Sequence, residues 1–354
     1  MADAPRVPPA RGRLRRGLTV AGVALFLILC VPVGVGWYLL YAPASRVPAD
    51  ERVSIEVPSG STTAGIARIL AGSGVVANAN MFRIQTRLAG ADGKLKAGRY
   101  DLYTGMPYEE VIDRLRKGPP IEYATVTIPE GFTIDQIADR LQAQAGVSAD
   151  DFRELATHGA DRFHRFYLDE VTTGSLEGYL FPKTYRLRRG ATATEAVNMM
   201  LDQFEKEVAA LDLDYARAKG RSLHDVVIIA SMIEREARLP KERSLVSSVI
   251  HNRLERGMYL EIDATIEYVL PGNRFRLRSK DLRIDSPYNT YRVRGLPAGP
   301  IANPGMASLR AAAAPASTGY IYYVLTGRDG SHTFCENASE FAAAKRRSKE
   351  VFGK

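Results

Sequence analysis

The chain has 354 residues, of which 45% are hydrophobic and 25% charged, with a formal net charge of +8 and an isoelectric point of about 9.4. This is the composition of a globular protein that can bury a core, and the length predicts two modest domains or one elongated body. Basic residues beyond the N-terminal tail are interleaved with acidic ones rather than gathered in a stripe, which argues against nucleic-acid binding. Attraction to anionic lipid or to a wall polymer would explain the positive charge equally well.

The first predicted element is a membrane-spanning helix over residues 17–41, after an arginine-rich tail of residues 1–16. The stretch from Leu18 to Tyr41 carries no charge, and a bilayer needs roughly 20 apolar residues. The arginines should stay in the cytoplasm, so we expect a single-pass protein of the inner membrane whose body faces outward. A cleaved signal peptide is the alternative, because Ala42-Pro43-Ala44 imitates a cleavage site, but its apolar core would exceed the usual roughly 7–15 residues.

The cysteines and histidines predict neither a disulfide nor a metal site. Cys30 lies inside the predicted span, which leaves Cys335 alone beyond it. The 5 histidines are scattered and show no ligand spacing such as HExxH. We therefore expect no metal and no cofactor, and a body that is stabilised by its hydrophobic core.

After a linker over residues 42–52, the sequence repeats itself. Val57-Pro58-Ser59-Gly60-Ser61-Thr62 returns as Ile128-Pro129-Glu130-Gly131-Phe132-Thr133, and each copy lies between an alternating strand pattern and a helical apolar pattern. Each final Thr is placed as a helix N-cap after a turn. The repeat predicts two related α/β units, over residues 53–120 and 121–205, and we expect the second to contribute to a cleft.

A strand, turn and helix with this spacing resemble the LysM fold, a small module associated with binding N-acetylated glycan chains. The alternative is that the units form only a scaffold, because a fold does not dictate a function. Farther on, we expect a buried helix from His224 to Arg238 and a second one that opens at Pro240 and stops at Gly257. Pro-, Gly- and Asn-rich loops follow, and residues 206–354 are predicted to form the catalytic domain of an α+β protein.

Two carboxylates, Glu234 and Glu236, are set into the apolar run from Ile228 to Ala237. A carboxylate that loses water is harder to ionise, so its pKa rises and it becomes a candidate proton donor. Helical spacing does not choose between the two, since each stacks over apolar residues one turn earlier. A surface glutamate paired with Arg238 is the alternative interpretation.

Several motifs follow one another in the second half of the chain. They are Leu176 to Tyr185, Ala230 to Glu236, His251 to Leu254, Glu261 to Tyr268, Ser286 to Tyr291, and Gly295 to Gly305. In this collinear order they resemble the endolytic murein transglycosylase family, also called MltG or YceG-like. That family has one N-terminal membrane anchor and an extracytoplasmic body with a LysM-like part, and the resemblance covers nearly everything after the predicted anchor.

The resemblance implies cleavage, without water, of the β-1,4 bond between N-acetylmuramic acid and N-acetylglucosamine in a nascent peptidoglycan strand. The product end would be a 1,6-anhydromuramoyl residue, and strand elongation would stop there. The family's essential glutamate falls on Glu234, which would act as general acid and then as base; Glu236 would be a structural neighbour. The implied partners are peptidoglycan strands and the peptidoglycan synthases of the membrane.

Polar side chains of the later motifs are candidates for gripping the sugar, with loop capping by Asx-type hydrogen bonds as the alternative. The first candidates are Tyr288, Asn289, Thr290 and Tyr291, and the further ones are Asp263, Thr265 and Glu177.

The chain departs from the family's usual residues at Lys183, Glu261 and Ala264, where the family has an acid, Gln and Pro. Glu261 leaves open a second acid in the cleft, which would favour a hydrolytic muramidase. A non-catalytic wall-binding or assembly protein is the alternative from another functional class.

Overall fold

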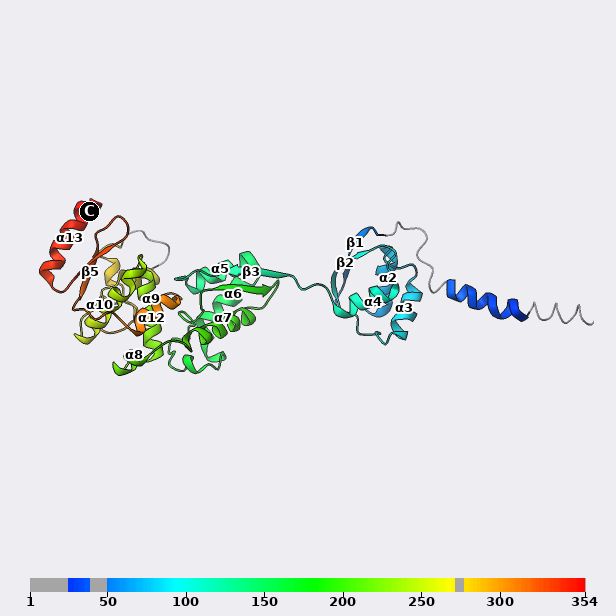
Figure 1. The fold of residues 1–354 in the computed structure, drawn as a ribbon, viewed down its shortest axis with the longest axis horizontal. Helices are drawn as coiled ribbons and strands as arrows, with labels where there is room; N and C mark the ends of the chain where they lie inside the picture. The colour runs from blue at the N-terminus through cyan, green and yellow to red at the C-terminus, as the bar shows by residue number, and fades with distance from the viewer. Residues whose placement is uncertain (1–24, 39–49, 271–276, 354) are drawn as a thin grey trace, which may run out of the picture. The chain divides into compact units, whose positions relative to one another are not determined.

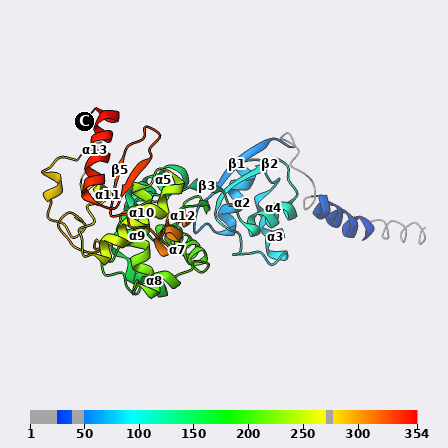
Figure 2. The ribbon, with the colours of Figure 1, turned by 60° about the vertical axis from the view of Figure 1, so that its left-hand side comes forward.

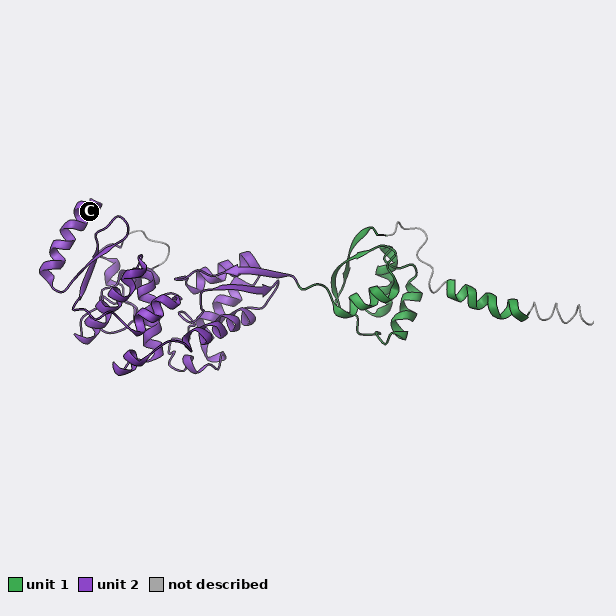
Figure 3. Cartoon of the chain, in the orientation of Figure 1, with its two compact units in different colours: residues 1–121 green, residues 122–354 purple. Residues whose placement is uncertain are grey.

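The computed structural model describes residues 25–38, 50–270 and 277–353 (Figure 1). The chain divides into two compact units, residues up to 121 and residues 122–354 (Figure 3). Each unit has a hydrophobic core of its own. Helices and small antiparallel sheets are mixed along the chain, which confirms the predicted α+β class.

Residues 25–38 form a helix whose apolar side chains are largely exposed, for example Phe26 at 64% and Ile28 at 67%. Within the described ranges, no helix is both long and apolar enough to cross a membrane. The rest of the predicted span, residues 17–24 and 39–41, lies outside the described residues, as does the tail before it. The membrane anchor therefore stays a prediction.

The first unit is built on an antiparallel pair of strands covered by helices. Alternation along the first strand turns Ile55 and Val57 into the core. The Thr62 hydroxyl accepts a hydrogen bond of 3.2 Å from the Gly65 N–H and caps the next helix, as the repeat predicts. The elements are β1 (Arg52–Val57), α2 (Thr63–Gly72), α3 (Ala79–Leu88), β2 (Gly98–Tyr103) and α4 (Tyr108–Lys117).

The second unit opens with the same order of strand, two helices, strand and helix, and its two strands are again antiparallel. Thr133 caps the first of these helices in a capping box with Gln136. The order of elements thus repeats, while the bounds of the two predicted units and glycan binding by a LysM-like unit stay predictions. The elements are β3 (Tyr123–Thr127), α5 (Ile134–Ala145), α6 (Ala149–His158), η1 (Ala160–Arg162), η2 (Phe166–Leu168), β4 (Thr184–Arg188) and α7 (Ala193–Val208).

The remainder of the second unit surrounds one central helix, α9 (Leu223–Glu236). Every residue from Val226 to Ile233 is buried, because α10, α11 and α12 all pack against α9 (Figure 2). One hydrophobic core joins these helices to the α/β part that precedes them. The other elements are α8 (Asp214–Ala218), η3 (Pro240–Glu242), α10 (Arg243–Glu255), α11 (Asp263–Val269), η4 (Asp281–Arg283), α12 (Met306–Ala313), β5 (Tyr322–Leu325), β6 (His332–Cys335) and α13 (Ala338–Phe352).

Candidate active site

The last turn of α9 brings Glu234 to the edge of the core. Its side chain is 7% exposed, and the residues of α9 before it are buried. Glu236 points to a different side of the helix, because two residues along an α-helix are about 200° apart. The two carboxylates that periodicity could not separate therefore lie in different surroundings.

Two donors from other helices hold the Glu234 carboxylate. Arg243, the first residue of α10, places Nη2 3.3 Å from Oε1, and the Gly305 N–H at the start of α12 donates to Oε2 at 3.0 Å. The Arg243 Nε in turn donates to the Ser308 hydroxyl at 3.1 Å. An arginine and a helix N-terminus both stabilise negative charge. The partner of Glu234 is thus Arg243 and not Arg238.

A second carboxylate, that of Glu130, lies beside the same glycine. A Cβ atom added to Gly305 would overlap the Glu130 carboxylate, so that group rests directly on the Gly305 backbone. Loss of water and the charge of Glu234 raise the pKa of Glu130, while Arg243 opposes the shift. The sequence interpretation missed Glu130 as a site residue. Its signal was a difference between the two repeats, because Ser59 stands at the matching place in the first.

Asn303 fixes the loop that carries Glu130. Asn303 is fully buried, and its backbone exchanges two hydrogen bonds of 2.9 Å with that loop, from the Gly131 N–H to its carbonyl and from its N–H to the Phe132 carbonyl. Its side-chain amide donates to the same Phe132 carbonyl at 3.0 Å. Since Gly305 follows two residues later, the loop and the donor to Glu234 are held together.

Glu177, predicted as a sugar-binding candidate, lies inside the protein at 2% exposure. Its Oε2 accepts hydrogen bonds from the Ile134 N–H at 3.1 Å and from the Tyr268 hydroxyl at 3.4 Å. Burial raises the pKa of Glu177 to about 8. In this conformation the carboxylate is not open to a sugar, and it joins α5, α11 and the chain before α12.

Three further candidates, Asn289, Thr290 and Thr265, are fully buried. The Asn289 amide donates to the Leu282 and Ile284 carbonyls at 3.1 and 2.7 Å. The hydroxyls of Thr265 and Thr290 lie 3.0 Å apart and bond to one another. The structure therefore places these residues in the loop-capping arrangement that was the alternative to sugar contact.

Tyr288, Tyr291 and Asp263 remain accessible. The Tyr288 ring is half-buried and packs against Tyr268, with centroids 5.2 Å apart. The Tyr291 hydroxyl donates to the Asp263 carboxylate at 2.5 Å. These three side chains keep surface that a sugar can contact, and an aromatic ring beside a polar group suits the C–H face and the polar rim of a pyranose.

Glu236 lies on the other side of α9. Its carboxylate accepts a hydrogen bond of 3.1 Å from the Tyr323 hydroxyl. Burial, with a further contribution from the charge of Asp263, raises the pKa of Glu236 to about 7. Glu236 thus has the raised pKa of a proton donor, but its neighbours differ from those of Glu234.

The two charged departures from the family pattern, Lys183 and Glu261, are ion-paired. Lys183 bonds Glu207 at 3.0 Å, and Glu261 bonds Arg253 at 3.1 Å. Glu261 also has a left-handed backbone, with φ of 50°. The second acid that the structure brings next to Glu234 is therefore Glu130 rather than Glu261.

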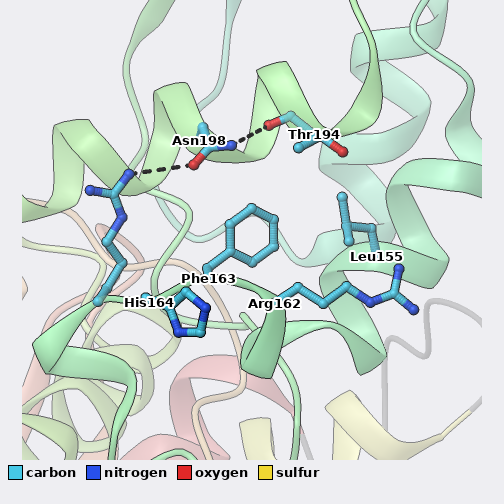
Figure 4. A pocket seen from close by; sticks show the side chains of 7 residues that line it. Leu155, Arg162, Phe163, His164, Thr194 and Asn198 are labelled. Atoms are coloured by element: carbon cyan, nitrogen blue, oxygen red, sulfur yellow. Dashed lines mark hydrogen bonds between the residues drawn. The ribbon is translucent and has the colours of Figure 1, made fainter.

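A separate hollow of about 340 Å³ lies between α6 and α7 (Figure 4). Its lining contains none of the predicted site residues, and Arg165 at its wall bonds Asp202 and Asn198. Within the described part of the chain, no group of His, Cys, Asp and Glu side chains has the arrangement of a metal site. The hollow is lined by Leu155, Arg162, Phe163, His164, Arg165, Thr194 and Asn198.

Comparisons with known proteins agree with one another. A sequence model of the YceG-like family matches residues 55–347. The endolytic murein transglycosylase of Bacillus subtilis is 33% identical over 326 residues, covering 88% of this chain and 90% of the relative. The protein of that name from Streptococcus pneumoniae is 29% identical over 360 residues, and the match spans 64% of its length. The crystal structure of a protein from Listeria monocytogenes described as YceG-like has a TM-score of 0.58 at 31% identity, covering 83% of this chain and 99% of that one.

Proposed function

This chain belongs to the YceG-like family, and from that membership we propose that it is a membrane-anchored endolytic lytic transglycosylase of peptidoglycan. It cleaves the β-1,4 bond between N-acetylmuramic acid and N-acetylglucosamine inside nascent strands and leaves 1,6-anhydromuramoyl ends. Strand elongation ends at each cut. The observation that carries the proposal is the Glu234 carboxylate, 7% exposed at the end of a buried helix and bonded by Arg243 and the Gly305 N–H.

In the first step Glu234 donates its proton to the glycosidic oxygen, and the bond from that oxygen to C1 of the muramoyl residue breaks. Positive charge develops at C1 and the ring oxygen, as in other glycoside cleavages. The proton loss leaves Glu234 ionised, and the Arg243 guanidinium and the Gly305 N–H stabilise that form. Tyr288, Tyr291 and Asp263 are the accessible groups proposed to hold the sugar.

In the second step the muramoyl 6-hydroxyl attacks C1, and its proton passes to the Glu234 carboxylate. A 1,6-anhydro bond forms, and the enzyme recovers its starting protonation state without consuming water. A hydrolytic glycosidase needs a second carboxylate for a nucleophile or an activated water. An internal hydroxyl removes that need, because it is already held next to C1.

We also propose that the uncharged stretch from Leu18 to Tyr41 anchors the enzyme in the inner membrane, with its body outside the cytoplasm beside the synthases. Support comes from the length of the stretch and from the exposed apolar side chains of the described helical part, such as Leu25 at 60%. Alkaline extraction of membranes tests this: an anchored protein stays in the pellet. Recovery of the whole chain in the soluble fraction would contradict the anchor.

Mass spectrometry of purified glycan strands treated with the full-length protein tests the activity. The expected products carry new anhydromuramoyl ends. New reducing ends in their place would make the protein a hydrolytic muramidase. Glycan binding with no new ends, even at high protein concentration, would make it a wall-binding or assembly protein.

A further inference from the structure

We infer that Glu130 is a positioning residue of the proposed reaction, whose negative charge beside Glu234 helps to keep the transferable proton at the site. The inference rests on the proposed function, and it adds a second acid to a reaction that formally requires one. It also explains two features that the proposed steps leave unused, namely the Glu130 loop and the absence of a side chain at position 305.

The geometry places both carboxylates on one glycine. Glu234 accepts the Gly305 N–H at 3.0 Å, and the Glu130 carboxylate occupies the space where a side chain at 305 would begin. Gly131, next to Glu130, has a left-handed backbone with φ of 76°. A Cβ atom added to Gly131 would lie 3.5 Å from the Cγ of Glu234. Two backbone hydrogen bonds, one donated by the Asn303 N–H and one accepted by its carbonyl, hold this loop. The approach of Glu130 to Glu234 is therefore built into the fold.

The charged groups that act on Glu130 are Glu234 from α9 and Arg243 from α10. α12 contributes the Gly305 N–H and the Ser308 hydroxyl, which are neutral donors. One positive charge thus faces two carboxylates, and retention of one proton relieves the excess negative charge.

The chemical consequence concerns the start of the reaction. Arg243 and the Gly305 N–H both bond the Glu234 carboxylate, an arrangement that suits the step in which it accepts a proton. The first step needs a protonated acid, and a neighbouring negative charge opposes early loss of that proton. Glu130 supplies this charge without contact to the bond that breaks.

The glycine offers an independent probe. Gly305 has φ of −81° and ψ of 170°, a backbone that alanine adopts freely. Its Cβ would meet the end of the flexible Glu130 side chain, which can swing away. Gly305→Ala therefore moves the Glu130 carboxylate while keeping both Glu130 and the 305 N–H.

The test is the pH dependence of cleavage by the full-length protein. The cleavage rate plotted against pH falls on its alkaline side, which we call the high-pH limb. We expect Glu130→Gln to move this limb down by about one pH unit, so that the rate at alkaline pH falls about tenfold. Gly305→Ala should give a similar shift, and it should add nothing in a Glu130→Ala background. The matched control is Glu122→Gln, an exposed glutamate just before β3 that pairs with Arg189 at 3.4 Å, and it should leave the limb in place.

A second measurement does not depend on activity. Carbon-13 NMR titration of the Glu130 carboxyl, assigned with Glu130→Gln, should show a lower pKa of Glu130 in Glu234→Gln, because burial still raises this pKa but the Glu234 charge no longer does. A normal high-pH limb in a folded, active Glu130→Gln would overturn the inference and leave the proposed function intact. Absence of any cleavage by the wild type would defeat the proposed function, and an unchanged Glu130 titration in Glu234→Gln would then also refute the pairing.

Discussion

The side-chain amide of Asn303 donates a hydrogen bond of 2.6 Å to the carboxylate of Glu177, and both side chains are buried. Glu177 also accepts the Ile134 N–H at the start of α5, while Asn303 stands just before Gly305. The pair therefore ties the helix after the Glu130 loop to the backbone that holds Glu234. A fully bonded buried network of this kind fixes geometry, and it is costly to leave incomplete.

Asn303→Ala should destabilise the second unit strongly. The amide oxygen of Asn303 accepts the Gly178 and Leu180 N–H groups at 2.9 and 2.8 Å, and its loss leaves buried donors without a partner. Each such group costs about 1–3 kcal/mol, so we expect the free energy of unfolding to fall by about 3–5 kcal/mol. Chemical denaturation measures this. Asn198→Ala, at a partly exposed position, is the control and should change stability by less than about 1 kcal/mol.

Stability should fall as the pH rises toward 8, because of Glu177. Its pKa in the folded protein, about 8, lies above the ordinary value of 4.5, so the folded state binds this proton more tightly. The stabilisation that comes from this proton is fully present below about pH 4.5 and is lost as the pH rises through about 8. We expect a slope of up to about 1.4 kcal/mol per pH unit between these values.

Glu177→Gln tests the origin of that slope, because an amide cannot titrate. Denaturation at several pH values gives the free energy of unfolding as a function of pH. This dependence should be flatter in the variant than in the wild type. Glu236, whose pKa is raised to about 7, contributes in the same direction and leaves a residual slope. Parallel pH profiles for the wild type and Glu177→Gln would show that Glu177 does not retain its proton.

The parts of the fold that the sequence predicts well depend on interactions between residues that are close in the chain. Thr62 and Thr133 cap helices because a Thr hydroxyl satisfies a free N–H in the first turn, a choice made within a few residues. The buried helix and the α+β class follow from apolar periodicity in the same way. In contrast, the neighbours that distinguish Glu234 from Glu236 come from other elements, and Gly305 is 71 residues away.

The sugar-binding predictions also depended on contacts that a local sequence pattern does not reveal. Asn289, Thr290 and Thr265 belong to motifs of the family, but a motif does not tell whether a polar side chain faces solvent or the backbone of its own loop. Asn303 was missed for a related reason, whereas Glu130 differs visibly from Ser59, the matching residue of the first repeat. Asn303 bonds Phe132 across 171 residues, and no pattern in one sequence reveals such a contact.

Glu234→Gln should remove cleavage while the protein stays folded. The amide keeps the shape of the side chain but cannot donate the required proton, and loss of general acid catalysis costs about 100- to 10,000-fold in rate. Release of anhydromuramoyl ends measures the effect. Glu236→Gln is the matched control on the same helix and should retain most activity; the opposite result would move the catalytic role to Glu236.

Arg243 and Glu234 should be coupled energetically. The Arg243 side chain is 15% exposed and its ion pair with Glu234 spans 3.3 Å, so removing one partner leaves the other charge poorly compensated. We expect Arg243→Gln to lower stability by about 1–3 kcal/mol and cleavage by about tenfold or more. In the double variant with Glu234→Gln part of the lost stability should be recovered, because the Glu130 carboxylate alone then remains without Arg243. Chemical denaturation of the four proteins gives the coupling energy, and strictly additive effects would show that the two side chains do not depend on each other.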